Sequence, residues 1–99
     1  MSQHQTENGK KWIEAEVYKM AAELGIQLDR PPDWNKVDLN FKMAVEVSGR
    51  REVLELSRAH IDDSQGGDNQ ATREVRAKLQ GQIRAFIERF EPPKKRIGF

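Results

Sequence analysis

Residues 37–47 read VDLNFKMAVEV, and this stretch decides the predicted fold. Apolar side chains occupy every second position from Val37 to Val47, and polar or small residues fill the positions between them. Such alternation is typical of a β-strand with one buried face, because successive side chains of a strand point to opposite sides. We therefore predict one strand over residues 37–47.

The strand is followed by residues 48–51, SGRR, which predict a tight turn. Gly49 then occupies the first central position, as a type II′ turn prefers. In this register Val45 faces Leu54, so the apolar faces of the two strands coincide. A second strand over residues 51–57 completes the predicted β-hairpin.

A helix is predicted on each side of the hairpin, because apolar residues recur there at helical spacing. The first helix covers residues 10–24 and the second covers residues 71–91. The apolar arc of the first comprises Ile13, Val17, Met20, Ala21 and Leu24. The apolar arc of the second comprises Val75, Leu79, Ile83, Phe86 and Phe90. Between the hairpin and the second helix, Ser57 can cap a single helical turn.

Together these elements predict an α+β fold of the order helix–β-hairpin–helix, with both helices packed on one face of the antiparallel hairpin. Residues 1–9 contain no large apolar side chain after Met1, and we predict a disordered leader there. Residues 10–91 are predicted to form a single α+β domain. Residues 92–99 read PPKKRIGF and form a C-terminal tail that is basic and then apolar.

The composition narrows the class of protein. Of the 99 residues 36% are hydrophobic and 33% are charged, so a small core must carry a highly charged surface. The net charge of +1 is far from the excess of a dedicated nucleic-acid-binding protein. The absence of cysteine excludes disulfides, thiolate metal sites and cysteine nucleophiles. No apolar run approaches the ~18 residues of a membrane span, and we expect a cytoplasmic protein.

The sequence does not indicate an enzyme, a cofactor site or a metal site. His60 lies near Asp62 and Asp63, but no nucleophile motif, phosphate-binding loop or metalloprotease motif accompanies it. A calcium-binding loop that starts at Asp62 would need a glutamate at its twelfth position, where Arg73 stands. We expect a non-catalytic protein without a cofactor or a metal ion.

Protein–protein association is the leading hypothesis, because a two-stranded sheet leaves both of its edges unpaired. Residues 26–28 or the tail could cover an edge, but we favour a second copy of the chain, which joins two hairpins into a four-stranded sheet in a homodimer. The predicted partner-binding residues are Tyr18, Val37, Leu39, Phe41, Ile97 and Phe99. A proline at Asn40 is then expected to disrupt association more than the helices.

A nucleic-acid-binding accessory protein is the alternative. Its basic residues would be Arg50, Arg51, Lys94, Lys95 and Arg96. The helix–hairpin–helix order is not enough to claim a resemblance to the double-stranded RNA-binding domain. That domain has a third strand and a lysine cluster at the start of its last helix, whereas residues 71–74 read ATRE and no third strand is predicted. The sequence therefore does not assign the chain to that family.

Overall fold

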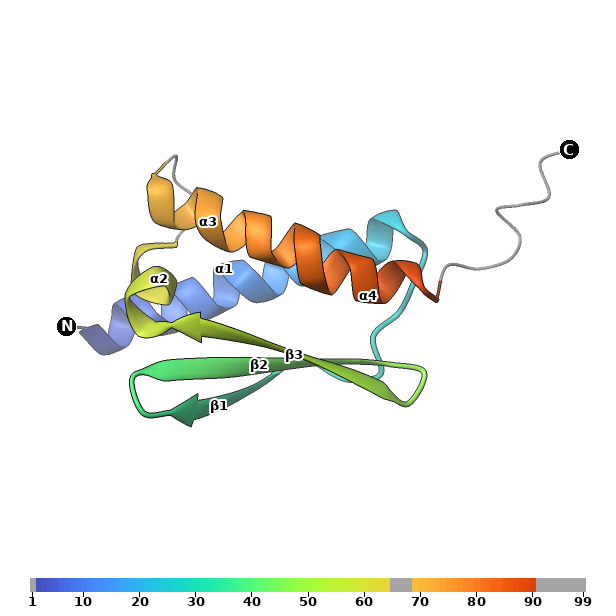
Figure 1. The fold of residues 1–99 in the computed structure, drawn as a ribbon, viewed down its shortest axis with the longest axis horizontal. Helices are drawn as coiled ribbons and strands as arrows, with labels where there is room; N and C mark the ends of the chain where they lie inside the picture. The colour runs from blue at the N-terminus through green and yellow to red at the C-terminus, as the bar shows by residue number, and fades with distance from the viewer. Residues whose placement is uncertain (1, 65–68, 91–99) are drawn as a thin grey trace, which may run out of the picture.

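The computed structural model describes residues 2–64 and 69–90 (Figure 1). They form an α+β fold, as predicted. The elements are α1 (Ser2–Glu23), β1 (Asp33–Val37), β2 (Asn40–Val47), β3 (Arg50–Ser57), α2 (Arg58–Asp63), α3 (Gln70–Lys78), the π-helical segment η1 (Leu79–Arg84) and α4 (Ala85–Glu88). Within these ranges no helix combines the length and the apolar character needed to cross a membrane.

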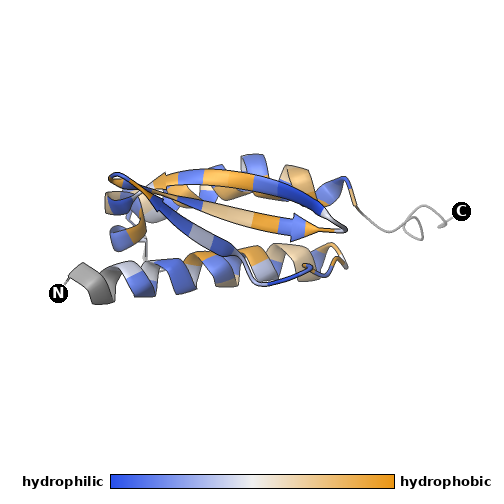
Figure 2. Ribbon diagram, turned by 90° about the horizontal axis from the view of Figure 1, so that it is seen from below, coloured by the Kyte–Doolittle hydropathy of each residue, from blue (hydrophilic) through white to orange (hydrophobic). Residues whose placement is uncertain are grey.

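The sheet has three antiparallel strands in the order β1-β2-β3 (Figure 2). The prediction of one strand over residues 37–47 is wrong in its first third, because the chain turns at Asp38 and Leu39 and Val37 pairs with Asn40. Asp38 has φ +56°, a left-handed conformation that aspartate tolerates. A two-residue turn reverses which positions face inward, because Val37 shares the face of its partner Asn40 and not that of Phe41. The apolar alternation therefore continues in the sequence but not on one face of the sheet.

The turn between β2 and β3 also differs from the prediction. Ser48 and Gly49 are its central residues, with φ of +51° and +80°, as in a type I′ turn rather than type II′. Met43 therefore faces Leu54, a shift of two residues from the predicted register. A shift of two leaves every side chain on its predicted face. The Asp29 carboxylate accepts hydrogen bonds from the N–H groups of Ser48 (2.9 Å) and Gly49 (2.8 Å) and fixes the turn.

Helix α1 and the continuous helical run α3–η1–α4 lie side by side on one face of the sheet (Figures 1 and 2). The core lies between these two layers. From α1 and the C-terminal helices it contains Ile13, Val17, Met20, Ala21, Leu24, Val75, Leu79, Ile83, Phe86 and Ile87. From the strands and α2 it contains Phe41, Met43, Val45, Val47, Leu54, Leu56 and Ile61.

The predicted disordered leader is wrong for residues 2–9, because α1 already begins at Ser2. Within this stretch Thr6 and Gly9 contact α2, the short helix that Ser57 caps as predicted. Gly9 is buried against α2, where an added Cβ would lie 1.8 Å from the carbonyl oxygen of Ile61. The Thr6 hydroxyl donates to a carboxylate oxygen of Asp62 at 2.5 Å.

Strand β1 is anchored to α1 through Trp34. The indole Nε1 donates to a carboxylate oxygen of Glu14 at 2.6 Å. The ring meets Phe41 edge-on, with centroids 6.4 Å apart, and Lys10 Nζ lies 4.4 Å from the Phe41 centroid. Trp34 therefore ties the loop and β1 to the core.

Candidate protein-binding groove

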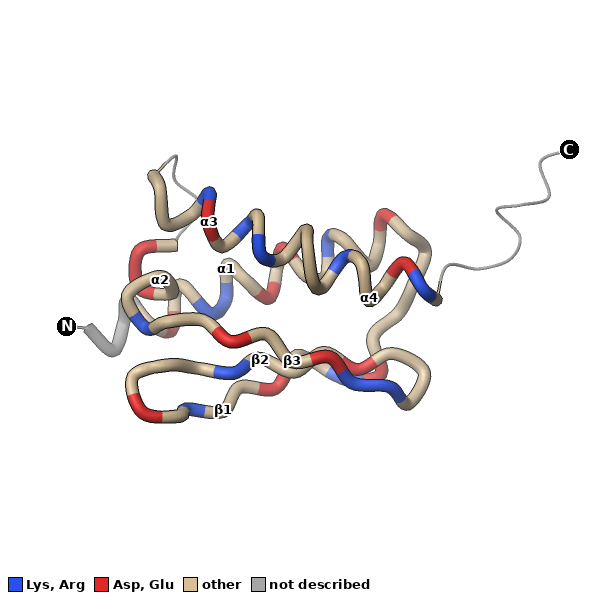
Figure 3. Tube along the Cα trace, in the orientation of Figure 1, with Lys and Arg blue, Asp and Glu red and all other residues tan. Residues whose placement is uncertain are grey.

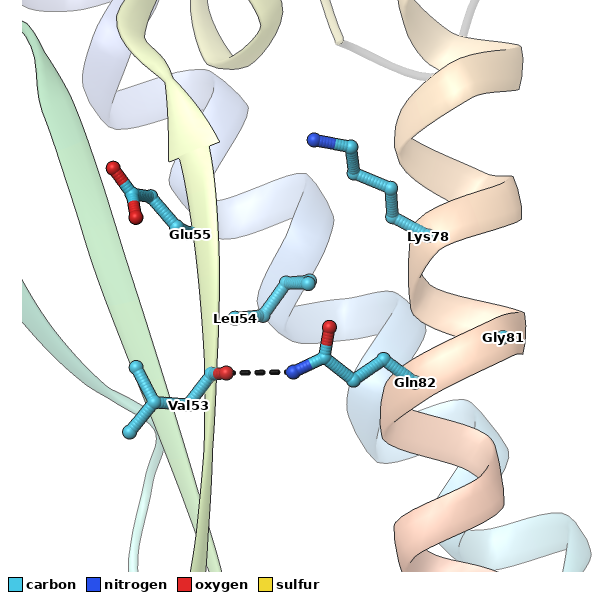
Figure 4. A pocket seen from close by; sticks show the side chains of 6 residues that line it. All are labelled: Val53, Leu54, Glu55, Lys78, Gly81 and Gln82. Carbon is cyan, nitrogen blue, oxygen red and sulfur yellow. Dashed lines mark hydrogen bonds between the residues drawn. The ribbon is translucent and has the colours of Figure 1, made fainter.

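The outer edge of β3 carries no further strand among the described residues. Beside it runs the helix α3–η1, and the two elements enclose a groove of about 510 Å³ (Figure 4). Its walls are Val53, Leu54 and Glu55 from β3 and Lys78, Gly81 and Gln82 from the helix. We refer to these six residues as the β3 groove.

The direction of the free backbone groups on β3 follows from one hydrogen bond. The Gln82 side-chain amide donates to the carbonyl oxygen of Val53 at 2.6 Å and to a carboxylate oxygen of Glu52 at 2.8 Å. The Val53 carbonyl therefore points away from β2 and into the groove. Backbone groups of a strand alternate between its two sides, so the N–H groups of Val53 and Glu55 and the Glu55 carbonyl also face outward.

The helical wall of the groove has an unusual backbone. Residues Leu79–Arg84 form a π-helical turn, and Gly81 lies within it. A Cβ added at Gly81 would meet no other atom within 4 Å, so internal packing does not require glycine there. Glycine inside a helix costs about 1 kcal/mol relative to alanine, and π-turns are rare and frequent at functional sites. Two costly local features thus coincide opposite an unpaired strand edge.

Charge is distributed unevenly across the β3 groove. Glu55 lies on the strand side and is exposed, and its carboxylate accepts a hydrogen bond from the Asn40 side chain at 2.7 Å. Glu52 lies on the inner face of β3, opposite Val45, and its carboxylate accepts a hydrogen bond from Gln82. Lys78 lies on the helix side, where Figure 4 shows its side chain extending from the helix toward β3. Each wall of the groove therefore carries one charged residue, Glu55 on the strand and Lys78 on the helix.

The predicted strand-edge site is not formed. Strand β2 is central and paired on both sides, and Phe41 is buried with 7% of its surface exposed. Val37 ends β1 with 37% of its surface exposed, and Leu39 stands in the β1–β2 turn at 79%. The prediction of an edge formed by these three residues is wrong because β1 covers it.

Tyr18 is placed at the surface, as a partner-binding residue requires. It is 44% exposed on α1 and borders a hollow of about 560 Å³ that Ala22, Ile26, Leu28 and Pro31 also line. This hollow lies on α1 and the following loop, away from the β3 groove. Ile97 and Phe99, the remaining predicted partner-binding residues, lie outside the described residues.

The basic residues at the hairpin tip are only partly available for a nucleic acid. Arg50 is exposed, but Arg51 pairs with Glu46 at 2.8 Å and with Asp33 at 3.5 Å on the outer face of the sheet. Figure 3 shows cations and anions interspersed along both layers. Lys94, Lys95 and Arg96 lie outside the described residues. The described chain therefore presents no long stripe of unpaired cations on the sheet.

Strand β1 supplies a third strand, one of the two features that the predicted helix–hairpin–helix order lacked, but the short helix α2 stands between β3 and the last helical run. The second difference persists. The last helix opens with Gln70, Ala71 and Thr72, and the Asn69 side chain caps it by accepting from the Thr72 N–H. An element order by itself does not define a function.

His60 joins two side chains that the sequence did not bring together. Its Nδ1 lies 2.9 Å from the Ser57 hydroxyl and its Nε2 lies 2.6 Å from a carboxylate oxygen of Glu74, which replaces the expected Asp62 or Asp63. Ser57 also accepts the His60 N–H at 3.2 Å, as an N-cap does. These contacts link α2 to α3.

Metal ligands do not gather in the described part of the chain: residues 2–64 and 69–90 contain no group of three or more His, Cys, Asp or Glu side chains suited to one ion. Comparison with known proteins adds no assignment, since no protein-family model, no curated protein and no solved structure matches this chain.

The residues of the β3 groove were missed in the sequence analysis, and one signal could have found them. Gly81 interrupts an otherwise regular amphipathic helix at a position outside the apolar arc. A glycine there has no role in the core, and an isolated glycine inside a helix often has a packing or functional reason. Val53 and Glu55 carried no such signal, because their meaning depends on which edge of the sheet stays open.

Proposed function

We propose that the protein is a non-catalytic module that binds an extended polypeptide segment of a protein partner as an added strand on β3. The observation that carries the proposal is the β3 edge, which carries no further strand in the described part of the chain and is faced by a π-turn containing Gly81, a glycine that internal packing does not require. A peptide backbone is the ligand that matches alternating outward N–H and C=O groups, because it can form the same ladder as a neighbouring strand.

The dimensions and surroundings of the groove support this class of ligand. Its volume of about 510 Å³ is open along the strand, and the missing side chain at Gly81 leaves room for residues of an added strand. Gln82 satisfies the Val53 carbonyl with a side-chain amide in the position that a ligand N–H would take. A ligand strand replaces that bond without leaving the carbonyl unpaired.

A peptide library tests the proposal directly. Random nine-residue peptides displayed on phage are selected against the immobilised full chain, and a selected peptide is titrated into the isotope-labelled protein. We expect the largest amide shifts at Val53, Glu55 and Gly81. Selection of no peptide, or shifts centred on the hollow beside Tyr18, would contradict the proposal.

Two variants separate strand addition from simple contact. Val53→Pro removes an N–H that faces the groove but none that pairs with β2, and a proline is tolerated at such an edge position. Gly81→Leu fills the open space beside β3. We expect each to weaken peptide binding at least about tenfold, a loss of roughly 1.4 kcal/mol. The matched controls Val53→Ala and Gln80→Leu, which changes an exposed neighbour outside the groove, should bind like the original chain.

The alternative nucleic-acid function has the exposed Arg50 at the hairpin tip in its favour, and the paired state of Arg51 against it. Its test is binding of a double-stranded RNA of 20 base pairs at low salt. Retention of binding after joint replacement of Arg50, Arg51 and residues 94–96 by glutamine would exclude those residues as the contact.

A further inference from the structure

We infer that the segment which occupies the β3 groove is residues 94–99 of a second copy of this chain, so that two copies exchange their C-terminal segments. This inference rests on the proposed function and names its partner. Residues 94–99 read KKRIGF. Six residues in extended conformation span about 20 Å, which matches the length of β3 from Arg51 to Ser57.

The alternation of the segment fits the two faces of the sheet. In an added strand Ile97 and Phe99 share one face and Arg96 lies on the other. With Ile97 and Phe99 directed toward the helices, they meet Leu54, which is buried, and the open space beside Gly81. Glycine at position 81 is then explained by the apolar residues that need its missing side chain.

The cations of the segment also find carboxylates of opposite charge on β3. Arg96 then lies on the outer face of the sheet, where Glu55 is exposed. Lys95 shares the face of Ile97 and reaches Glu52, which lies on the inner face opposite Val45. Two carboxylates on the strand wall thus meet the cations of the segment, and the attraction weakens as salt increases.

The handedness of the connection from β3 through the helices favours exchange between two copies over docking within one chain. The helical run returns to the end of the molecule where β3 begins (Figure 1). A strand that follows α4 in the same chain would therefore run parallel to β3. With the helices on the face shown in Figures 1 and 2, this connection would be a left-handed crossover, whereas about 98% of such crossovers are right-handed. A segment from a second copy has no such restriction.

A complementation experiment with full-length chains tests the inference. Ile97→Asp combined with Phe99→Asp disables the segment, and Gly81→Leu disables the groove. We expect sedimentation velocity to find a dimer for the original chain and monomers for both variants. An equimolar mixture should form a heterodimer, because the intact groove of one variant accepts the intact segment of the other. Gly98→Ser, which keeps both elements, should remain a dimer.

The outcomes distinguish this inference from the function on which it rests. A monomeric original chain at concentrations up to about 1 mM, or a mixture that stays monomeric, overturns the exchange. If library peptides still bind at Val53 and Glu55 in that case, the proposed function stands with a different partner. If the original chain is a dimer that Gly81→Leu does not dissociate, another surface holds it and the inference is wrong.

Discussion

Two helical glycines in this protein have opposite surroundings. Gly9 in α1 is buried, and a Cβ there would lie 1.8 Å from the carbonyl oxygen of Ile61, a backbone atom that cannot move aside alone. Gly81 in η1 has no atom within 4 Å of the same position. The first glycine permits the close crossing of α1 and α2. The second has no such role, and its destabilising effect on the helix points to a function outside the fold.

Replacing each of the two glycines by alanine should change the stability of the protein in opposite directions. Gly9→Ala should destabilise the protein by about 1–3 kcal/mol, because the added methyl group forces two backbones apart. Gly81→Ala should stabilise it by about 0.5–1 kcal/mol, because alanine restricts the unfolded chain and fits the helix without contact. Urea denaturation followed by circular dichroism measures both. A loss of stability in Gly81→Ala would mean that its surroundings are not open.

At the scale of elements, short side-chain links hold α2 against its neighbours. His60 connects Ser57 at the start of α2 with Glu74 in α3. Gln70 donates a second hydrogen bond to Glu74 at 2.8 Å. The hydrogen bond from Gln70, followed by that from His60, lowers the pKa of Glu74 below the ordinary value of a glutamate. The link is therefore strongest when Glu74 is ionised.

The lowered pKa determines the direction of a pH effect. A carboxyl group whose pKa is depressed by folding stabilises the protein above its unfolded pKa, and this contribution is lost as the pH falls through the folded value. Glu74→Gln should therefore lower stability at pH 7 and flatten its decline between about pH 5 and pH 3. Urea midpoints across that range measure the effect. Asp63→Asn, an equal change of charge in α2, should keep the slope of the original protein; an equal flattening there would contradict the link.

At the scale of the whole molecule, the central position of β2 decides which backbone groups are replaceable. Asn40 pairs with Val37 on one side and Ser57 on the other. The Asn40 N–H faces β1, since Val37 and Asn40 close the two-residue turn. β2 is therefore not the free edge that the sequence predicts, and its pairing supports the entire sheet.

A proline at Asn40 is accordingly expected to disrupt the folded chain itself rather than its association. It removes a ladder hydrogen bond and leaves a carbonyl unpaired, a cost of about 1–3 kcal/mol before any change in the turn. Thermal unfolding of Asn40→Pro against Asn40→Ala isolates the backbone effect from loss of the side-chain bond to Glu55. An unfolding temperature equal to that of Asn40→Ala would contradict the central position of β2.

The sequence predicts β2 but not β1, and the difference has a physical reason. Strand β2 is buried on its inner face by Phe41, Met43 and Val45, so its alternation is visible in the sequence. Strand β1 reads DWNKV and contributes to the core mainly through Trp34. An edge strand with so little buried surface carries no period-two pattern, and the third strand was missed with it.

The sequence by itself determined the elements whose apolar faces are buried: the C-terminal helix, α1 beyond Gly9, β2, β3 and the cap at Ser57. Burial of one face of an element requires apolar residues at the period of that element, and this period can be recognised in the sequence. Only the tertiary structure decided the start of α1, the third strand, the type I′ register and the open edge beside Gly81. Each of these depends on which segments meet in space, as α2 meets Gly9 and Asp29 meets the Ser48 turn, and contacts between distant residues leave no periodic trace in a single sequence.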